Sequence, residues 1–122
     1  MWIFTKFGFY SVVSHWQNPD TLIVRGRVSS DFDRLLDRVG STLQRSKDDV
    51  VVDPDADYRY RIFVDRSLWS RAMSELSADI DYSNFKNEVQ KFLGEDRADA
   101  CHAVWDIMYE FQEREENIFE HP

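Results

Sequence analysis

The sequence has few of the residues that cross-link or anchor small proteins. Cys101 is the only cysteine among 122 residues, which excludes an intrachain disulfide and a zinc site built from several cysteines. Apolar runs are only a few residues long, and no apolar stretch follows the first cation, Lys6. We therefore expect a soluble, cytoplasmic protein that is neither exported nor bound to a membrane.

Motifs for catalysis, metal ions and cofactors are also missing. The segment DPDAD at residues 53–57 begins like an EF-hand loop, but Tyr58 stands where that loop needs glycine and Val64 where it needs glutamate. Cys101 and His102 are neighbours on an expected helix, so their side chains point about 100° apart and cannot form a nucleophile–base pair. The sequence predicts no catalytic residue, no metal and no cofactor, and it favours a binding protein over an enzyme.

Apolar, aromatic and acidic residues are abundant instead. The chain is 43% hydrophobic and 15% aromatic, enough for one core, so residues 1–122 are expected to form a single domain with about six frayed residues at its end. The net charge is −8, and residues 95–122 hold nine acids against two arginines, which places −7 there and −1 in the rest. Such a chain repels phosphate backbones at long range, and its acidic end suits a basic protein partner.

Hydropathy patterns predict strands first and helices later. Residues 1–13 indicate two short strands or one bulged strand, and alternation over 21–28 and 58–64 indicates two more. Residues 41–57 are polar, with at most a short edge strand. Helices are expected after the N-caps Ser30, Asp65 and Ser83 and from Asp96 onward. The order ββ(β)α(β)βααα favours an α+β fold, in which a single-layer mixed or antiparallel sheet carries its helices on one face.

Four arginines alternate with the apolar residues of two expected strands. Arg25 and Arg27 lie on one, and Arg59 and Arg61 on the other, all on the face opposite the core. If the strands are neighbours, the arginines form one patch that can bind carboxylate or phosphate oxygens bidentately. The alternative is that they pair with acids of this chain. Sheets with aromatic and arginine side chains also bind single-stranded nucleic acid, but no RNP-type motif is present.

The junction between two expected helices gathers side chains used in recognition. Tyr82, Asn84 and Lys86 are candidates to line a cleft beside the arginine-bearing strand, which completes the predicted binding residues. The alternative is that residues 79–86 only cap helices and form a turn.

Five segments carry a resemblance to a known group of proteins. They are WIFT at 2–5, GFYSVV at 8–13, DYRYR at 57–61, IDYSNFK at 80–86 and WDIMY at 105–109. Together they resemble a family of small bacterial conserved hypothetical proteins with no established function. The resemblance covers most of the chain and implies a single-domain bacterial protein, but it supplies no catalytic residue.

Three hypotheses about function follow. The first is a small binding or adaptor domain that contacts a macromolecule, most simply a protein, through the arginine face or the acidic last helix. The second is an enzyme acting on a phosphorylated or nucleotide substrate, with the arginines as an anion clamp and Asp57 or Asp81 as general base. The third is an acidic phage or host accessory protein that blocks a nucleic-acid-binding machine. A homodimer paired through an edge strand such as Trp2 to Thr5 is a further expectation.

Overall fold

The computed structural model describes the backbone of residues 1–120 and the side chains of residues 1–117. The chain divides into two compact units, Met1–Asp81 and Tyr82–Pro122, which are described separately. The last six residues, for which the sequence predicts fraying, lie largely outside the part with described side chains. Within the described part, no helix combines the length and the apolar character needed to cross a bilayer.

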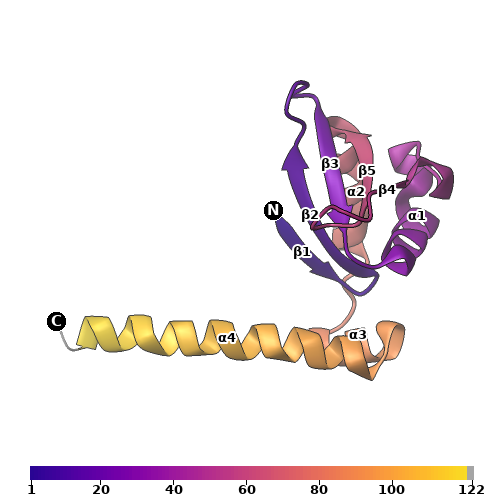
Figure 1. Cartoon of the computed structure of the whole chain (residues 1–122). Helices are drawn as coiled ribbons and strands as arrows, with labels where there is room; N and C mark the ends of the chain where they lie inside the picture. Colours follow the sequence, from indigo (N-terminus) through magenta and orange to yellow (C-terminus); the bar gives the residue numbers. More distant parts are fainter. Residues whose placement is uncertain (121–122) are drawn as a thin grey trace. The chain divides into compact units, whose positions relative to one another are not determined.

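The first unit is built on a five-stranded antiparallel sheet (Figure 1). Its strands are β1 (Trp2–Thr5), β2 (Gly8–Ser14), β3 (Thr21–Gly26), β4 (Val51–Val52) and β5 (Tyr60–Asp65). They lie in the order β1-β2-β3-β5-β4, so β5 pairs with the third strand and the short β4 forms an edge. The fold is α+β, as the sequence predicts.

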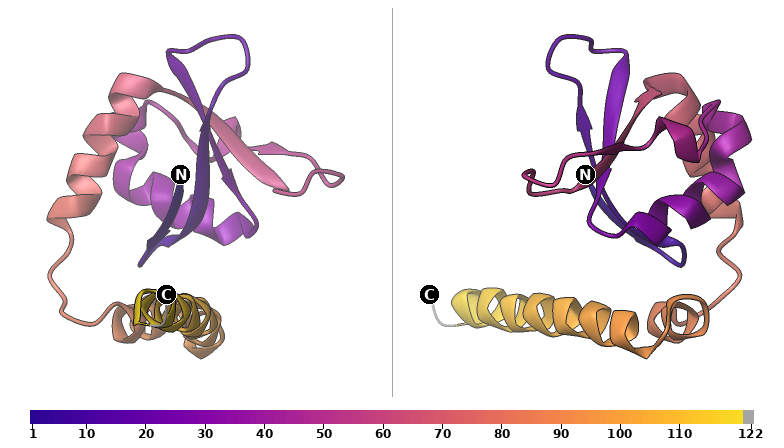
Figure 2. Two further views of the ribbon diagram at one scale, coloured as in Figure 1. Left: turned by 90° about the vertical axis from the view of Figure 1, so that its left-hand side faces the viewer. Right: turned by 45° about the vertical axis from the view of Figure 1, so that its right-hand side comes forward.

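Helices α1 (Ser29–Leu43) and α2 (Arg66–Ala78) cover one face of this sheet (Figure 2). The alternating residues of the strands supply the sheet side of the core, and the register places Val12 beside Val24 and Val24 beside Ile62. All three are at most 5% exposed. They pack against the helical residues Phe32, Leu35, Leu36, Val39, Leu43, Trp69, Ala72 and Leu76. The alternation read from the sequence therefore identifies the buried face correctly.

Helix α1 begins differently from the sequence expectation. Its N-cap is Val28, whose side chain cannot cap, and Ser30 lies inside the first turn. The reason is Asp31, which is buried and uses its carboxylate Oδ2 to accept a hydrogen bond from the backbone N of Phe9 at 3.1 Å. Gly8 makes this approach feasible, because a Cβ there would lie 2.6 Å from Asp31 Oδ2. The start of α1 is thus fixed by the β1–β2 hairpin.

Two other boundaries differ from the predicted ones. Helix α1 continues through Gly40 and ends at Gln44, which adopts a left-handed conformation with φ 56°. A 3₁₀ turn over Lys47–Asp49 then leads to β4. Strand β5 starts at Tyr60 rather than Tyr58, which leaves Tyr58 in the preceding bend.

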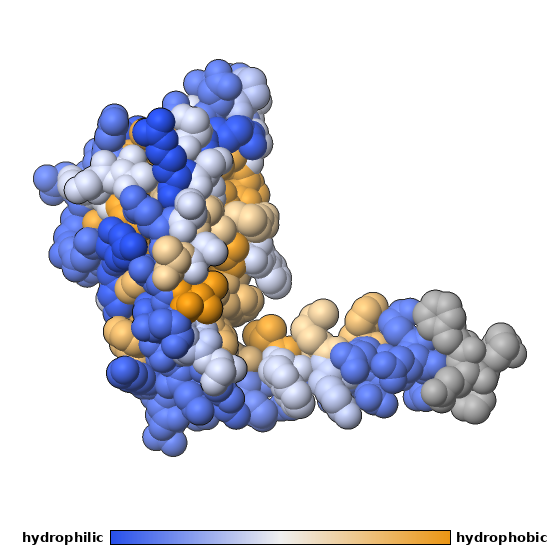
Figure 3. Space-filling view, turned by 180° about the vertical axis from the view of Figure 1, so that it is seen from behind, coloured by the Kyte–Doolittle hydropathy of each residue, from blue (hydrophilic) through white to orange (hydrophobic). Residues whose placement is uncertain are grey.

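The second unit is a pair of helices, α3 (Phe85–Leu93) and α4 (Glu95–Glu120). Asn84, rather than Ser83, caps α3 by accepting a hydrogen bond from the backbone N of Asn87 at 3.0 Å. Val89 and Ala98 are buried where the two helices pack. In the space-filling view, the hydrophobic residues of α4 gather along one side of the helix (Figure 3).

Candidate binding surface on the open face of the sheet

The face of the sheet opposite α1 and α2 carries an unusual set of side chains, and we call it the open face. Its strand residues are Trp2, Phe4, Phe9, Ser11, Val13, Thr21, Ile23, Arg25, Val51, Arg61, Phe63 and Asp65. The register aligns five of them in a row across all five strands, in the order Trp2, Ser11, Arg25, Arg61 and Val51. Asp65, at the end of β5, is the one acidic strand residue of this face, and its side chain caps α2. The rest of the face is mainly apolar, with two cations near its middle.

The β1–β2 hairpin supplies an aromatic group at one edge of the open face. Phe4 stacks on Phe9 with ring centroids 4.6 Å apart, and Trp2 meets Phe9 edge-on at 5.8 Å. Trp2 is nevertheless 68% exposed. An indole held by a neighbouring ring and still exposed presents a large apolar area with little conformational freedom to lose on binding.

A second aromatic group comes from the turn between β2 and β3. His15 and Trp16 stack with centroids 4.0 Å apart, and both lie near the ring of Phe63. The Nδ1 atom of His15 accepts hydrogen bonds from the backbone N of Gln17 and Asn18, which holds the turn in place. Trp16 is 70% exposed, so this turn adds a second large apolar side chain.

Three of the four predicted arginines gather around Tyr58, and we call Arg25, Arg27 and Arg61 the arginine cluster. The guanidinium carbons of Arg25 and Arg27 lie 4.6 and 4.3 Å from the centroid of the Tyr58 ring. Arg25 also donates to Ser11 Oγ at 2.6 Å, and Arg61 donates to the carbonyl of Tyr58 at 3.1 Å. These contacts fix the cations by cation–π attraction and hydrogen bonds before any ligand arrives.

Acidic side chains border this cluster on one side. Arg27 Nη1 lies 3.2 Å from Asp57 Oδ1, and the Asp57 side chain is 80% exposed. Asp53 and Asp55 are exposed in the same loop. The positive charge of the cluster is thus partly compensated within the chain. For Arg27, this agrees with the alternative that the arginines pair with acids of the same chain.

The remaining predicted binding residues lie elsewhere. Arg59 follows the bend before β5 and has an exposed side chain, whereas the contacts with Tyr58 described above come from Arg25, Arg27 and Arg61. Tyr82, Asn84 and Lys86 belong to the second unit, where Asn84 caps α3 and Lys86 Nζ lies 3.4 Å from His102 Nδ1. The structure therefore brings Arg25, Arg27 and Arg61 together, and it does not join the other four residues to them.

The residues of the helix junction line a hollow within the second unit. Ser83, Asn84, Phe85, Lys86, Cys101, His102 and Trp105 surround it. Burial raises the pKa of the Cys101 thiol above its usual range, with a smaller opposing effect from Arg97. A protonated thiol is a poor nucleophile, so this hollow lacks the thiolate that cysteine catalysis requires.

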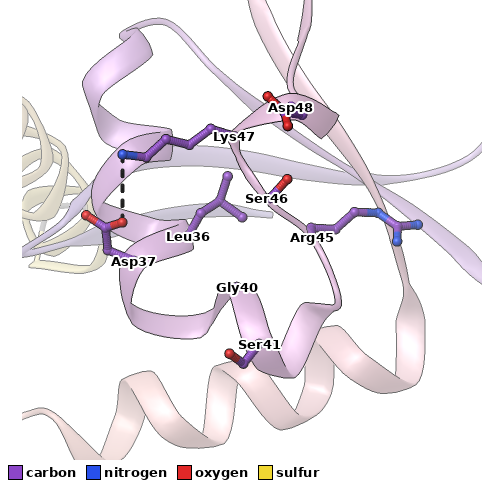
Figure 4. Close-up of a pocket in the computed structure, with 8 residues that line it drawn as sticks. All are labelled: Leu36, Asp37, Gly40, Ser41, Arg45, Ser46, Lys47 and Asp48. Carbon is purple, nitrogen blue, oxygen red and sulfur yellow. Dashed lines mark ion pairs between the residues drawn. The ribbon is translucent and has the colours of Figure 1, made fainter.

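A further hollow lies between α1 and the segment that follows it (Figure 4). Leu36, Asp37, Gly40, Ser41, Arg45, Ser46, Lys47 and Asp48 line it. Lys47 Nζ faces Asp37 Oδ1 across it at 3.8 Å, and Arg45 Nε is engaged by the carbonyl of Phe63 at 2.8 Å. Its cations are used within the chain, so the hollow offers less to a ligand than the open face does.

Sequence reasoning missed Tyr58, Trp16 and Trp2 as parts of the site. Tyr58 alternates with Arg59 and Arg61 in the sequence, which predicts that it faces away from them, but its place in a bend, outside β5, turns its ring toward Arg25 and Arg27. Trp16 lies outside any strand, so alternation gives no signal for it. A usable signal was the composition itself, because tryptophan, tyrosine and arginine are the residues most enriched at binding hot spots.

Comparisons with protein-family models, with curated proteins and with solved structures find no match for this chain. The resemblance to small bacterial proteins therefore stays a prediction. Function has to be inferred from the surfaces of the molecule.

Proposed function

We propose that this protein is a binding domain that holds a protein partner on the open face of its sheet. The observation that carries the proposal is the row from Trp2 through Arg25 and Arg61 to Val51, which contains no acid in a chain of net charge −8. Exposed Trp2 and Trp16 extend the same surface. Ser11 and Ile23 are buried within the face, so the surface offered to a partner consists of the exposed aromatic side chains and the arginine cluster, residue types enriched at interaction sites.

The composition of the open face favours a protein ligand. Tryptophan, tyrosine and arginine contribute most to the affinity of protein interfaces, because they bury large areas and still offer hydrogen bonds. Trp2, Arg25 and Arg27 are already held by neighbouring rings, so binding costs less side-chain entropy than it would for free side chains. The partner is expected to contribute apolar side chains to the tryptophans and a carboxylate to the arginine cluster.

A nucleic-acid ligand has less support. Binding of a phosphate backbone depends on several free cations, and its strength falls with each one lost. Here Arg27 is paired with Asp57, and Asp53 and Asp55 lie in the same loop. The exposed aromatic rings could stack on bases, but the acidic loop would repel the phosphates that join them.

A binding assay with two designed peptides tests the proposal. The probes are fluorescein-labelled 18-residue helical peptides with leucine along one side and either glutamate or lysine along the other, together with a labelled oligothymidylate. We expect the glutamate peptide to bind, and the double variant Trp2→Ser, Trp16→Ser to weaken binding at least about tenfold. The matched control is Ser70→Ala on the exposed side of α2, which is expected to leave binding unchanged.

Two results would contradict this function. Equal binding of the glutamate peptide by wild type and the double tryptophan variant would remove the open face as the site. Tighter binding of oligothymidylate than of either peptide, lost in Arg61→Ala, would replace the protein partner with single-stranded nucleic acid.

The enzyme hypothesis receives less support from the geometry. Of its two candidate bases, Asp57 is ion-paired with Arg27 and largely exposed, so it does not lie in an enclosed substrate site. Asp81 ends the first unit, also with an exposed side chain. We expect an assay of the wild-type protein to show no turnover of phosphate esters, although its binding surface is intact.

The acidic side of α4 supports a second candidate function. Asp99, Asp106, Glu110 and Glu113 share this side of the helix and are all exposed. Such a stripe suits the hypothesis of an acidic protein that occupies a basic, nucleic-acid-binding groove. Unchanged binding to a basic probe, polylysine, after neutralisation of Glu110 and Glu113 would count against it.

A further inference from the structure

Helix α4 has a large apolar surface with no partner inside its own unit. Helix α3 is short and packs against the first turns of α4, where Ala98 is 5% exposed. Beyond that point, six large apolar side chains are between 41% and 62% exposed. They are Val104, Trp105, Ile107, Met108, Tyr109 and Phe111. Monomeric proteins seldom leave so much contiguous apolar surface in water.

The spacing of these residues is that of a coiled coil. Cys101, Val104, Met108 and Phe111 follow one another at intervals of three, four and three residues, which forms a single seam along a helix. Trp105 and Ile107 flank this seam and widen it. A wide apolar seam needs a second helix of the same character to cover it.

Most of the acids of α4 are placed away from the seam. Asp99, Asp106 and Glu113 recur every seven residues on the opposite side, and Glu110 and Glu116 lie next to them. The positions that border the seam hold Trp105, Ile107, Gln112 and Arg114. Glu115 is the one acid on the seam line among the residues with described side chains. Two copies of this helix can therefore approach without bringing rows of like charge together.

We propose that α4 is a dimerisation helix, whose seam packs against the same seam of a second copy of this chain. Val104, Met108 and Phe111 of the seam and the flanking Trp105 and Ile107 are between 41% and 62% exposed, so the same seam of a second copy offers them apolar surface to pack against. The stacking of Trp105 on Tyr109, with centroids 5.2 Å apart, presents these rings in a fixed arrangement. The proposal does not rest on the open face of the sheet.

Sedimentation equilibrium of the full chain at micromolar concentrations tests the dimer. Wild type is expected to be a dimer and Met108→Glu a monomer, because the substitution places a charge in the centre of the seam. The matched control Ala103→Glu adds the same charge at an exposed position outside the seam and is expected to remain a dimer. A wild type that sediments as a monomer throughout this range would overturn the proposal.

Two further variants distinguish loss of the seam from loss of the helix and from a dimer interface on the sheet. Met108→Ala, which keeps the helix and adds no charge, is expected to raise the dimer dissociation constant about tenfold at unchanged helical circular dichroism. The double variant Trp2→Ser, Trp16→Ser is expected to remain a dimer. Its conversion to a monomer would overturn the seam as the interface and assign the second copy to the sheet instead.

Discussion

Arg38 of α1 binds the carboxylate of Asp79 at the end of α2 with two parallel hydrogen bonds. Its Nε donates to Oδ2 at 2.7 Å and its Nη2 to Oδ1 at 2.9 Å. Bidentate pairs of this kind are stronger and more directional than single ion pairs. The pair therefore ties together the two helices that cover the core face of the sheet.

This pair predicts an acid-sensitive contribution to stability. The hydrogen bond from Arg38 holds the pKa of Asp79 below its ordinary value of 3.8, against an opposing effect of burial and with smaller help from the charges of Arg38 and Lys6. A carboxyl whose pKa is lower in the folded than in the unfolded chain stabilises the fold above its ordinary pKa. That stabilisation is lost as pH falls through the lower, folded-state value.

We therefore expect Asp79→Asn to be less stable than wild type at pH 7, with the difference shrinking below pH of about 4. Urea denaturation of wild type and variant at pH 7 and at a pH below about 4 measures this difference in stability. Asp37→Asn is the control, because Asp37 is 73% exposed and only loosely paired with Lys47 at 3.8 Å. A difference that persists undiminished at low pH would show that the asparagine acts by another route.

The contact between Gly8 and Asp31 predicts a strongly coupled pair of substitutions. A Cβ at residue 8 would lie 2.6 Å from Asp31 Oδ2, so Gly8→Ala is expected to destabilise the fold by about 1–3 kcal/mol. The Cβ of Asp31 would also lie 2.6 Å from the new Cβ, so only Asp31→Gly removes the obstruction, and Gly8→Ala with Asp31→Gly should cost less than the sum of the two single variants. Strict additivity in denaturation experiments would rule out the clash as the cause.

The hydroxyl of Tyr10 is expected to contribute to the stability of the fold, and the hydroxyl of Tyr60 is not. Tyr10 is fully buried and donates to the carbonyl oxygen of Asp31 at 2.6 Å, so Tyr10→Phe should cost about 1–2 kcal/mol by removing this buried hydrogen bond. Tyr60→Phe removes a hydroxyl for which no hydrogen bond appears among the described side chains, and its effect should be close to zero. Thermal unfolding of the two variants makes the comparison, and equal losses would contradict it.

The arginine cluster depends on a ring at residue 58. Tyr58→Phe keeps the surface on which Arg25 and Arg27 lie and is expected to change stability little. Tyr58→Leu removes both cation–π contacts and is expected to be less stable than Tyr58→Phe by about 1 kcal/mol. The Nε–H resonances of the two arginines report the same change, and their persistence unshifted in Tyr58→Leu would contradict the role of the ring.

The sequence was sufficient for the elements that depend on local pattern. Alternation placed Val24 and Ile62 on the buried face, and Asp65 was correctly recognised as a helix cap, since its side chain accepts from the backbone N of Ser67 and Leu68. Element order and the α+β class follow from the same local signals. These features are decided by residues within a few positions of one another.

Other features depend on contacts between distant segments, and local pattern does not contain them. Ser30 has the chemistry of a cap, but the pairing of Asp31 with the backbone of Phe9 moves the start of α1 upstream. Arg25 and Arg61 meet only because β5 pairs with β3, which no local signal determines. The binding role of Arg59, Tyr82, Asn84 and Lys86 stays a prediction.

The position of β3 between β2 and β5 has a consequence for how the chain folds. The β1–β2–β3 meander closes through short turns, whereas the pairing of Val24 with Ile62 must wait until the whole of α1 has been brought round. Closing a long loop costs more entropy than closing a short one, and such distant pairings set the speed of folding. We therefore expect the meander to gain protection against hydrogen exchange early in refolding. The pairing of Arg25 with Arg61, which needs β5, should form last.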